Sequence, residues 1–468
     1  MIRVKFALLL FFLAATAEAA TLSQKIDEIL QHQRLLSAKV SMQIIRLSDG
    51  AILYEKDPDR LLNPASVSKL VTAAAALQIL GPDYQFRTEF YTDQEKAEGV
   101  FHHLWVKGYG NPLFVTEELE MLIQTIQSKG WTKVEGDFLI DDTFFNHDHP
   151  VTYFSDESEK VYRVVTGPLS FNFNTVEIFV RPASHRGVPA LIQLKPETQY
   201  FSVVNQTKTD GRRASVSSSL EVQGQRLIVE GRVPLRSRGA SFRQAVSEPT
   251  LYTGTVIREA MERAGISFGG HIRREPVPIA AKPVLQHLSA PLPTLMRAMG
   301  KLSNNFVAEQ LFLALGAARY GPPGVLDKGS RAAAEYLASL GVSNNYYVEN
   351  GSGLSKLSRL SSNQIIAVLR ELYQKRWREE AISSLSVGGI DGTLRRRFRG
   401  MLKGKVFGKT GSLNQVVSLA GYLFVEEEPV AFAFLFNDFS ASPHRIQRAE
   451  EKILEAVYKE VHAMRAVR

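Results

Sequence analysis

Residues 63–80 read NPASVSKLVTAAAALQIL, a turn followed by a run rich in alanine and leucine. Such a run predicts a buried helix with Ser66 at its start. The stretch holds the one Ser-x-x-Lys of the chain, formed by Ser66 and Lys69. Positions i and i+3 share a helix face, so the Lys69 amine can reach the Ser66 hydroxyl and accept its proton. A helix cap followed by a solvated lysine is the alternative interpretation of this motif alone.

A lysine acts as a base only when it is neutral, and burial beside a second cation favours the neutral amine. The chain offers a second lysine motif in Lys409-Thr410-Gly411, which occurs once, is followed by Ser412 and comes at the end of a strand-like run. We expect Lys409 and Thr410 to hold a substrate carboxylate, and Gly411 to let the strand approach the ligand without a side chain in the way. The alternative is an ordinary surface strand end.

A Ser-x-Asn pattern is the third motif, and it recurs. We select Ser303-Asn304-Asn305, because it interrupts a helical stretch and lies between the other two motifs. Ser303 would relay a proton between the lysines and the leaving group, and Asn305 would bond a substrate amide and Lys69. The pattern occurs at Ser170, Ser303, Ser343, Ser361 and Ser412.

Both ends of the chain contain strand patterns. Residues 40–45 and 51–54 flank the turn pair Asp49-Gly50 and predict a hairpin. Near the other end, residues 416–425 and 430–437 predict two further strands before a long helix over 443–463. These patterns predict a single sheet that is built from both ends of the chain. The middle of the chain reads as short strands with one helix, over residues 117–127, and therefore as an insertion.

Composition narrows the chemistry. The 468 residues are 44% hydrophobic and 22% charged, which is typical of a globular protein, and the absence of cysteine excludes disulfides, thiolate metal sites and a cysteine nucleophile. Residues 1–20 predict a signal peptide and hence export to the periplasm, and no later segment is apolar enough to span a membrane. Cleavage leaves 54 basic and 47 acidic residues, a net charge of +7. This surplus favours solubility first and an anionic wall or lipid surface second, and nucleic acid is not an expected partner.

Taken in order, the three motifs resemble those of the penicillin-recognising serine peptidases. The long insertion after the first motif resembles the type-4 penicillin-binding protein group, the D-alanyl-D-alanine carboxypeptidase/endopeptidases. Residues 63–70, 136–141 and 391–394 agree with that group. The resemblance implies an α+β fold: a β-lactamase/transpeptidase-like domain with an antiparallel sheet between helices. It would comprise residues 21–85 and 285–468, and residues 86–284 would form an inserted β-rich region of two small nested domains.

The resemblance also implies a mechanism. Ser66 attacks the carbonyl of the penultimate D-alanine of a peptidoglycan stem peptide, Lys69 takes the proton, and the backbone N–H groups of Ser66 and Ser412 form the oxyanion hole. D-alanine leaves and water resolves the acyl-enzyme; on a cross-link the same chemistry is an endopeptidase reaction. β-Lactams would acylate Ser66 and stay attached. The expected catalytic set is Ser66, Lys69, Ser303, Asn305 and Lys409, and Thr410, Gly411, Ser412 and Asp141 would bind substrate.

Two positions bear on substrate preference. Residues 349–355 resemble a stretch of that group which usually carries aspartate at the position of Asn350. The negative charge is lost here, whereas asparagine tolerates the same turn conformation. Asp141 matches a position that in relatives helps to hold the amine of a diaminopimelate side chain.

Other motifs predict less. His147-Asp148-His149 lacks a third metal ligand, so neither a metal nor another cofactor is expected. The arginines at 395, 396, 397 and 399 read as a solvated face, with wall or membrane attraction as the alternative. Residues 351–353 lack the spacing of an α/β-hydrolase nucleophile elbow. Two alternative functions stay open, a β-lactamase and a catalytically silent wall-binding protein.

Overall fold

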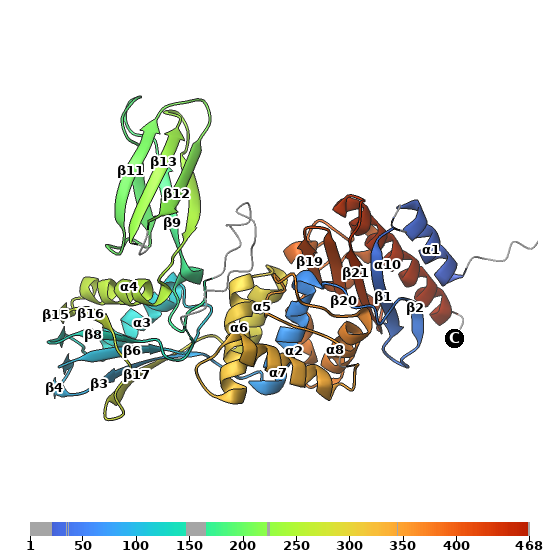
Figure 1. Ribbon diagram of the computed structural model, residues 1–468, viewed down its shortest axis with the longest axis horizontal. Helices are drawn as coiled ribbons and strands as arrows, with labels where there is room; N and C mark the ends of the chain where they lie inside the picture. Colours follow the sequence, from blue (N-terminus) through green and yellow to red (C-terminus); the bar gives the residue numbers. More distant parts are fainter. Residues whose placement is uncertain are drawn as a thin grey trace, which may run out of the picture.

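The computed structural model describes residues 21–466, apart from residues 34, 36, 147–164, 222–224 and 344. The predicted signal peptide and the His147-Asp148-His149 triplet lie outside these residues. Figure 1 shows a helix-covered sheet at one end of the molecule, a smaller mixed region at the other and a β lobe that projects away from both. No helix of the described residues is long and apolar enough to cross a membrane.

A six-stranded antiparallel sheet joins the two ends of the chain, as the sequence predicts. The first strand of the N-terminal hairpin pairs along its whole length with the last strand of the chain, so that Val40 lies opposite Phe436. The strand order is β18 (Ser386–Val387), β19 (Val406–Leu413), β20 (Val416–Val425), β21 (Glu428–Asn437), β1 (Lys39–Arg46) and β2 (Ile52–Lys56).

Alternation along β21 divides the core into two layers. Phe432 and Phe434 pack toward α1 (Leu22–His32) and α10 (Pro443–Ala466), whereas Ala431 and Ala433 belong to the core on the opposite face. That second core contains the buried helix α2 (Lys69–Ile79), in which every residue from Lys69 to Leu77 is buried. Around it lie α5 (Leu292–Lys301), α6 (Asn305–Tyr320), α7 (Leu326–Ser339), α8 (Ser362–Gln374) and α9 (Arg378–Ser383).

The middle of the chain first forms two small sheets. One has the order β16 (Ile272–Arg274), β8 (Phe138–Asp141), β6 (Leu104–Gly108), β3 (Arg87–Thr92) and β17 (Lys282–Leu288). The other has the order β15 (Ser267–Phe268), β7 (Lys133–Val134), β5 (Val100–Phe101) and β4 (Glu95–Ala97).

Two helices accompany these sheets, α3 (Thr116–Ser128) and α4 (Pro249–Arg263). The sequence predicts α3 but not α4. Helix α4 carries threonines, a tyrosine and a glycine, which are weak helix formers, and it is stabilised instead by burial of side chains such as Tyr252 and Ile257.

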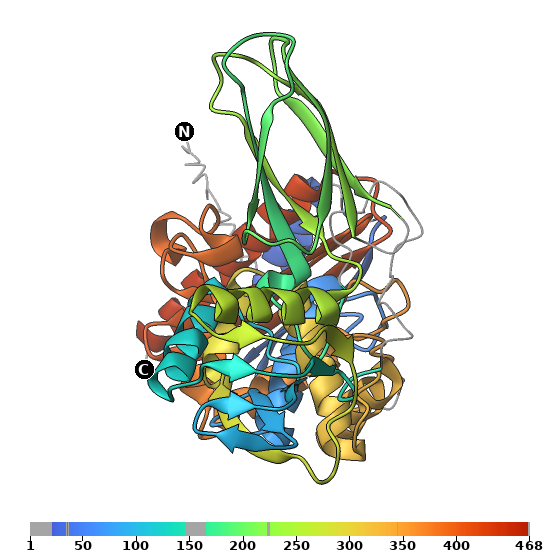
Figure 2. The ribbon, with the colours of Figure 1, turned by 90° about the vertical axis from the view of Figure 1, so that its left-hand side faces the viewer.

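The lobe contains two three-stranded sheets. Their orders are β10 (Leu191–Lys195), β9 (Thr175–Arg181), β14 (Ala240–Ala245) and β11 (Ser202–Thr209), β13 (Arg226–Val233), β12 (Ser215–Leu220). Figure 2 shows its strands standing upright on the rest of the molecule. The boundaries at residues 85/86 and 284/285 stay predictions.

Candidate active site

Ser66 lies in a strained turn at the start of α2. A 3₁₀ helix, Ala65–Ser68, precedes the α-helix, and Ala65 has a φ of 45° in the left-handed region. In a 3₁₀ helix, residues three apart eclipse one another, so Ser66 and Lys69 share a side. Ser66 remains partly exposed while its neighbours Val67 and Ser68 are buried. The predicted pairing of serine and lysine therefore forms with the hydroxyl open to solvent.

Lys69 makes three hydrogen-bonding contacts, as many as a neutral amine can satisfy. Its Nζ lies 3.0 Å from Ser66 Oγ, 2.8 Å from Asn305 Oδ1 and 2.6 Å from the carbonyl oxygen of Ser352. A neutral amine has two N–H donors and one lone pair. The amide and carbonyl oxygens can only accept, so the two N–H groups go to Asn305 and Ser352. The lone pair then faces the Ser66 hydroxyl, which is the arrangement that deprotonation of Ser66 requires.

Burial favours the neutral form of both lysines. Loss of hydration lowers the pKa of Lys69 well below its ordinary value; the charge of Lys409 lowers it further and the carboxylate of Glu309 opposes both. Burial alone lowers the pKa of Lys409 to about 7. Both side chains are 1% exposed. The solvated-lysine interpretation of the first motif and the surface-strand interpretation of the second are therefore wrong.

The Ser303 segment owes its shape to a break between two helices. Ser303 adopts a left-handed backbone with φ 54°, and Asn304 caps α6 by accepting a hydrogen bond from Val307 N at 3.1 Å. Asn305 therefore begins α6 and faces Lys69. On the other side, Lys409 Nζ donates to Ser303 Oγ at 2.9 Å. Among the five Ser-x-Asn patterns, the selected one meets both lysines.

The Lys-Thr-Gly motif lies within β19, whereas the sequence places it at the end of a strand. Thr410 Oγ1 donates to Thr393 Oγ1 at 2.9 Å. A β-carbon at Gly411 would lie 2.1 Å from Ser418 Oγ and 3.0 Å from Ser66 N, so this position has no room for a side chain. Glycine thus lets the strand pass against the backbone of Ser66, and the next residue, Ser412, is exposed.

A buried glutamate behind Lys69 is a feature that the sequence interpretation missed. Glu309 lies one helical turn after Asn305 and is 0% exposed. It accepts from Asn350 Nδ2 at 2.7 Å, Ser352 N at 3.1 Å and Gly351 N at 3.3 Å. Burial raises its pKa, and these bonds and the Lys69 charge oppose the rise. A glutamate four residues after Asn305, and so on the same face of a largely apolar helix, was the available signal.

Asp141 ends β8 in a site that is already filled. Its carboxylate receives Lys107 Nζ at 2.8 Å, Val277 N at 2.9 Å, and the backbone and hydroxyl of Thr143 at 2.9 and 2.6 Å. A carboxylate has about four lone-pair directions, and these contacts use them all. Substrate binding by Asp141 stays a prediction, and in this conformation Lys107 takes the place of a substrate amine.

An apolar wall connects the inserted region with the cluster formed by Ser66, Lys69, Ser303 and Lys409. Phe173, from the lobe side of the insertion, packs edge to face on Phe306, with ring centroids 5.9 Å apart. Leu354 and Leu413 complete this cluster. Phe306 follows Asn305 and Leu413 follows Ser412, so the wall borders the residues expected to bind substrate.

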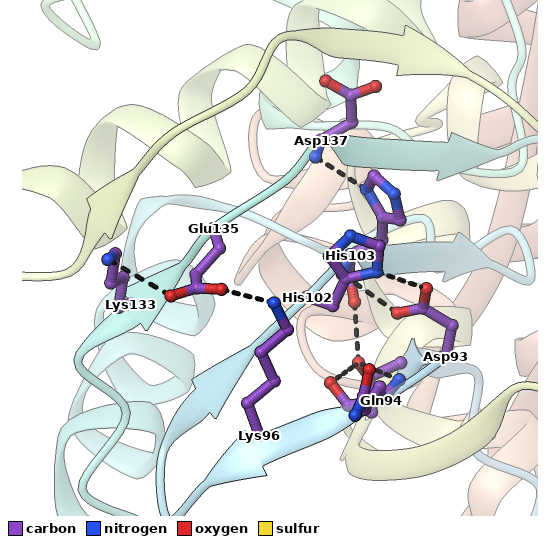
Figure 3. Close-up of polar contacts among 9 residues, drawn as sticks. Asp93, Gln94, Lys96, His102, His103, Lys133, Glu135 and Asp137 are labelled. Atoms are coloured by element: carbon purple, nitrogen blue, oxygen red, sulfur yellow. Dashed lines mark hydrogen bonds and ion pairs between the residues drawn. The ribbon is translucent and has the colours of Figure 1, made fainter.

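One other group of side chains resembles a metal site. In the described parts of the chain, Asp93, His102 and His103 bring potential ligand atoms within 4.8 Å of one another (Figure 3). Hydrogen bonds already use these atoms. His102 Nδ1 lies 2.7 Å from Asp93 Oδ2, and the backbone N–H of Asp137 donates to His103 Nδ1 at 2.8 Å. The neutral His103 ring then carries its proton on Nε2, so neither nitrogen of this ring offers a free lone pair to a metal.

The fold and the cluster together are those of a serine peptidase. The chain belongs to the D-Ala-D-Ala carboxypeptidase 3 (S13) family, which matches residues 22–457. It is 30% identical to the D-alanyl-D-alanine carboxypeptidase of Actinomadura sp. (strain R39) over 457 residues, which cover 93% of this chain and 85% of that protein. The predicted serine-type peptidase is thereby confirmed.

Solved structures agree on the fold. Penicillin-binding protein 4 (dacB) from Haemophilus influenzae superposes with a TM-score of 0.78 at 22% identity, covering 93% of this chain and 99% of the other. A predatory peptidoglycan endopeptidase from Bdellovibrio bacteriovorus superposes with a TM-score of 0.53 at 16% identity, covering 90% and 93%. The predicted α+β fold class and the resemblance to the type-4 penicillin-binding proteins are confirmed.

Proposed function

We propose that this protein is an exported D-alanyl-D-alanine carboxypeptidase that also cleaves D-alanyl cross-links of peptidoglycan, through an acyl-enzyme on Ser66. The observation that carries the proposal is the position of Lys69 Nζ, which lies 3.0 Å from Ser66 Oγ, 2.8 Å from Asn305 Oδ1 and 2.6 Å from the Ser352 carbonyl oxygen. In the neutral amine, this arrangement directs the lone pair at the Ser66 hydroxyl. Family membership supports the carboxypeptidase reaction. The predicted signal peptide at residues 1–20 supports export to the periplasm.

In the proposed reaction, Ser66 Oγ bonds to the carbonyl carbon of the penultimate D-alanine while its proton passes to Lys69. The backbone N–H groups of Ser66 and Ser412 stabilise the oxyanion. The C–N bond breaks, and the leaving amine takes a proton relayed through Ser303, which bonds Lys409. Water then attacks the ester, which releases the peptide carboxylate and regenerates the Ser66 hydroxyl.

Substrate contacts follow from the same cluster. Lys409 and Thr410 would bind the terminal carboxylate, Gly411 would let the peptide lie along β19, and Asn305 would bond its amide. A β-lactam presents the same carboxylate and a reactive carbonyl, so we expect it to acylate Ser66. In support, a Haemophilus influenzae penicillin-binding protein 4 structure contains a β-lactam.

The test is incubation of the mature protein with a fluorescent penicillin, followed by intact mass, beside a Ser66→Ala control. A stable adduct absent from the control supports the acylating serine. Hydrolysed penicillin without an adduct would indicate a β-lactamase. If a folded sample gives neither an adduct nor hydrolysis, the remaining interpretation is a catalytically silent wall-binding protein. Purified monomeric and cross-linked muropeptides then separate carboxypeptidase from endopeptidase activity.

A further inference from the structure

Positive charge is concentrated in the projecting lobe. Residues 175–245 contain 11 lysines and arginines against five acidic residues, a net charge of +6, whereas the whole chain has a net charge of +8. All 11 cationic side chains are exposed. This short segment therefore carries most of the charge surplus of the protein.

The end of the lobe that projects farthest from the rest of the molecule consists of residues 181–190, 208–215 and 232–240, and we call it the tip (Figures 1 and 2). Most of the cations of the lobe belong to these three segments. Backbone contacts hold these segments together: Gly187 N donates to Thr209 O at 3.0 Å, and Ser215 pairs with Arg232. Eight cations lie on the tip: Arg181, Arg186, Lys208, Arg212, Arg213, Arg232, Arg236 and Arg238.

Within the described parts of the chain, these eight side chains form no ion pair with an acidic residue. Asp210 is the one acidic residue in the tip segments. Among the described residues, no ion pair includes any of the eight, whereas Arg226 near the other end of β13 pairs with Glu221 at 2.9 Å. Like charges gathered on one end of a lobe repel one another and do not help it to fold. Their arrangement therefore suits an anionic partner outside the chain.

The second basic cluster of the sequence differs in this respect. Arg397 is partly buried there, with its side chain 13% exposed, and it bonds Glu450 at 2.7 Å and Glu451 at 3.0 Å, so it forms structural ion pairs rather than part of a solvated face. Arg395, Arg396 and Arg399 remain exposed. This cluster is smaller than the tip.

We propose that the tip docks on the surface of a bilayer rich in anionic phospholipid. The cations lie on turns and strand ends around a protruding end, so they can meet a planar array of charges at once. Seven of the eight are arginines, whose planar guanidinium groups can bind phosphate oxygens in pairs. Clusters of basic residues are attracted to the surface of bilayers that contain anionic lipid.

Docking by the tip would hold the catalytic cluster away from the lipid. Strand β11 has eight residues, and at about 3.3 Å per residue it spans roughly 26 Å. The lobe would act as a spacer between the bilayer and the peptide substrate.

The test is co-sedimentation of the full mature protein with phosphatidylcholine vesicles that contain or lack phosphatidylglycerol. The tip variant changes Arg212, Arg213, Arg236 and Arg238 to glutamine. The matched control changes four exposed cations of α10, at the opposite side of the molecule, to glutamine and so removes the same charge. These are Arg445, Arg448, Lys452 and Lys459.

The wild type and the α10 variant should bind the anionic vesicles, and the tip variant should lose at least about tenfold in partitioning. Binding should disappear at about 1 M salt, where the Debye length is about 3 Å. Equal loss in both variants would reduce the effect to net charge and overturn the proposal. The proposal would also be overturned if the wild-type protein bound a soluble phosphate polymer but did not bind the vesicles. Unchanged melting temperatures show that the variants are folded.

Discussion

Glu309 and Lys69 bond the two backbone polar groups of one residue, Ser352. The Glu309 carboxylate accepts from Ser352 N–H at 3.1 Å, and the Lys69 amine donates to the Ser352 carbonyl oxygen at 2.6 Å. The buried Glu309 carboxylate thus positions the loop at Ser352, and the carbonyl oxygen of this loop in turn positions Lys69, the expected base. The same charge acts directly on Lys69 by raising its pKa against the effect of burial.

Glu309→Gln should move the acidic limb of the acylation-rate profile to lower pH. Removing the carboxylate removes a charge that favours protonated Lys69, so the amine becomes neutral at lower pH. Second-order acylation by a penicillin, measured across pH, gives this limb. Glu309→Asp keeps the charge and is the control. A limb that stays in place would show that Glu309 acts through packing alone.

Lys409→Met should move the same limb to higher pH. The positive charge of Lys409 lowers the pKa of Lys69, and its removal allows the pKa to rise. The maximal rate should also fall, because the proposed contact of Lys409 with the substrate carboxylate is removed. The position of the limb separates these effects, and a shift in the same direction as that of Glu309→Gln would contradict the charge argument.

Lys409→Met should also stabilise the fold near pH 7. The wild-type lysine has a pKa of about 7 when folded against an ordinary 10.5, so the unfolded chain binds more protons between these values. Wild-type stability therefore rises with pH across this window, and the advantage of the variant shrinks by about 1.4 kcal/mol per pH unit. Urea unfolding at pH 7, 8 and 9 measures the difference. A difference that is constant with pH would refute the assignment.

Asn350→Asp should destabilise the protein at pH 8 more than at pH 5. The Asn350 amide donates to Glu309 at 2.7 Å, and an aspartate would place a second carboxylate there. One proton must then be shared, so the pair has a raised pKa in the folded state, and its contribution is lost as pH rises through that value. We expect a loss of about 1–3 kcal/mol at pH 8. Thermal melts of both proteins at the two pH values decide this.

Gly411→Ala should abolish acylation, while Gly408→Ala on the same strand should retain most of it. A methyl group at Gly411 would meet Ser418 Oγ at 2.1 Å and would push the strand from Ser66. At Gly408 the nearest atom is a flexible leucine carbon at 3.3 Å. Fluorescent penicillin labelling compares the two. Equal labelling would remove the steric requirement at Gly411.

Local motifs predicted the parts of the site that local spacing controls. Ser66 and Lys69 share a helix turn, and Lys409 stands in a strand, so their neighbours in sequence were enough to select them. Ser303 and Asn305 had to be chosen from five Ser-x-Asn patterns. The predicted helix break selected the pattern whose side chains contact Lys409 and Lys69 in the structure. Their catalytic roles stay predictions.

The remaining features depend on tertiary contacts that spacing does not reveal. Ser352 contributes a backbone carbonyl, which has no residue signature. Lys107 reaches Asp141 from a strand 34 residues earlier in the chain, and this pairing follows from the parallel register of β6 and β8. Helix α4 is stabilised by burial rather than by propensity, so a reading of residue types favoured strands there.

The pairing of β1 with β21 also determines when activity can arise. Asn437 Nδ2 donates to the carbonyl oxygen of Asn63, three residues before Ser66, at 3.0 Å and across 374 residues of sequence. Contacts of such high order form late in folding, because a long loop must close first. Ser66 and Lys409 therefore cannot meet until nearly the whole chain is available. A chain that lacked its last strands could not assemble the cluster of Ser66 and Lys409, so the site would form only after those strands had joined the sheet.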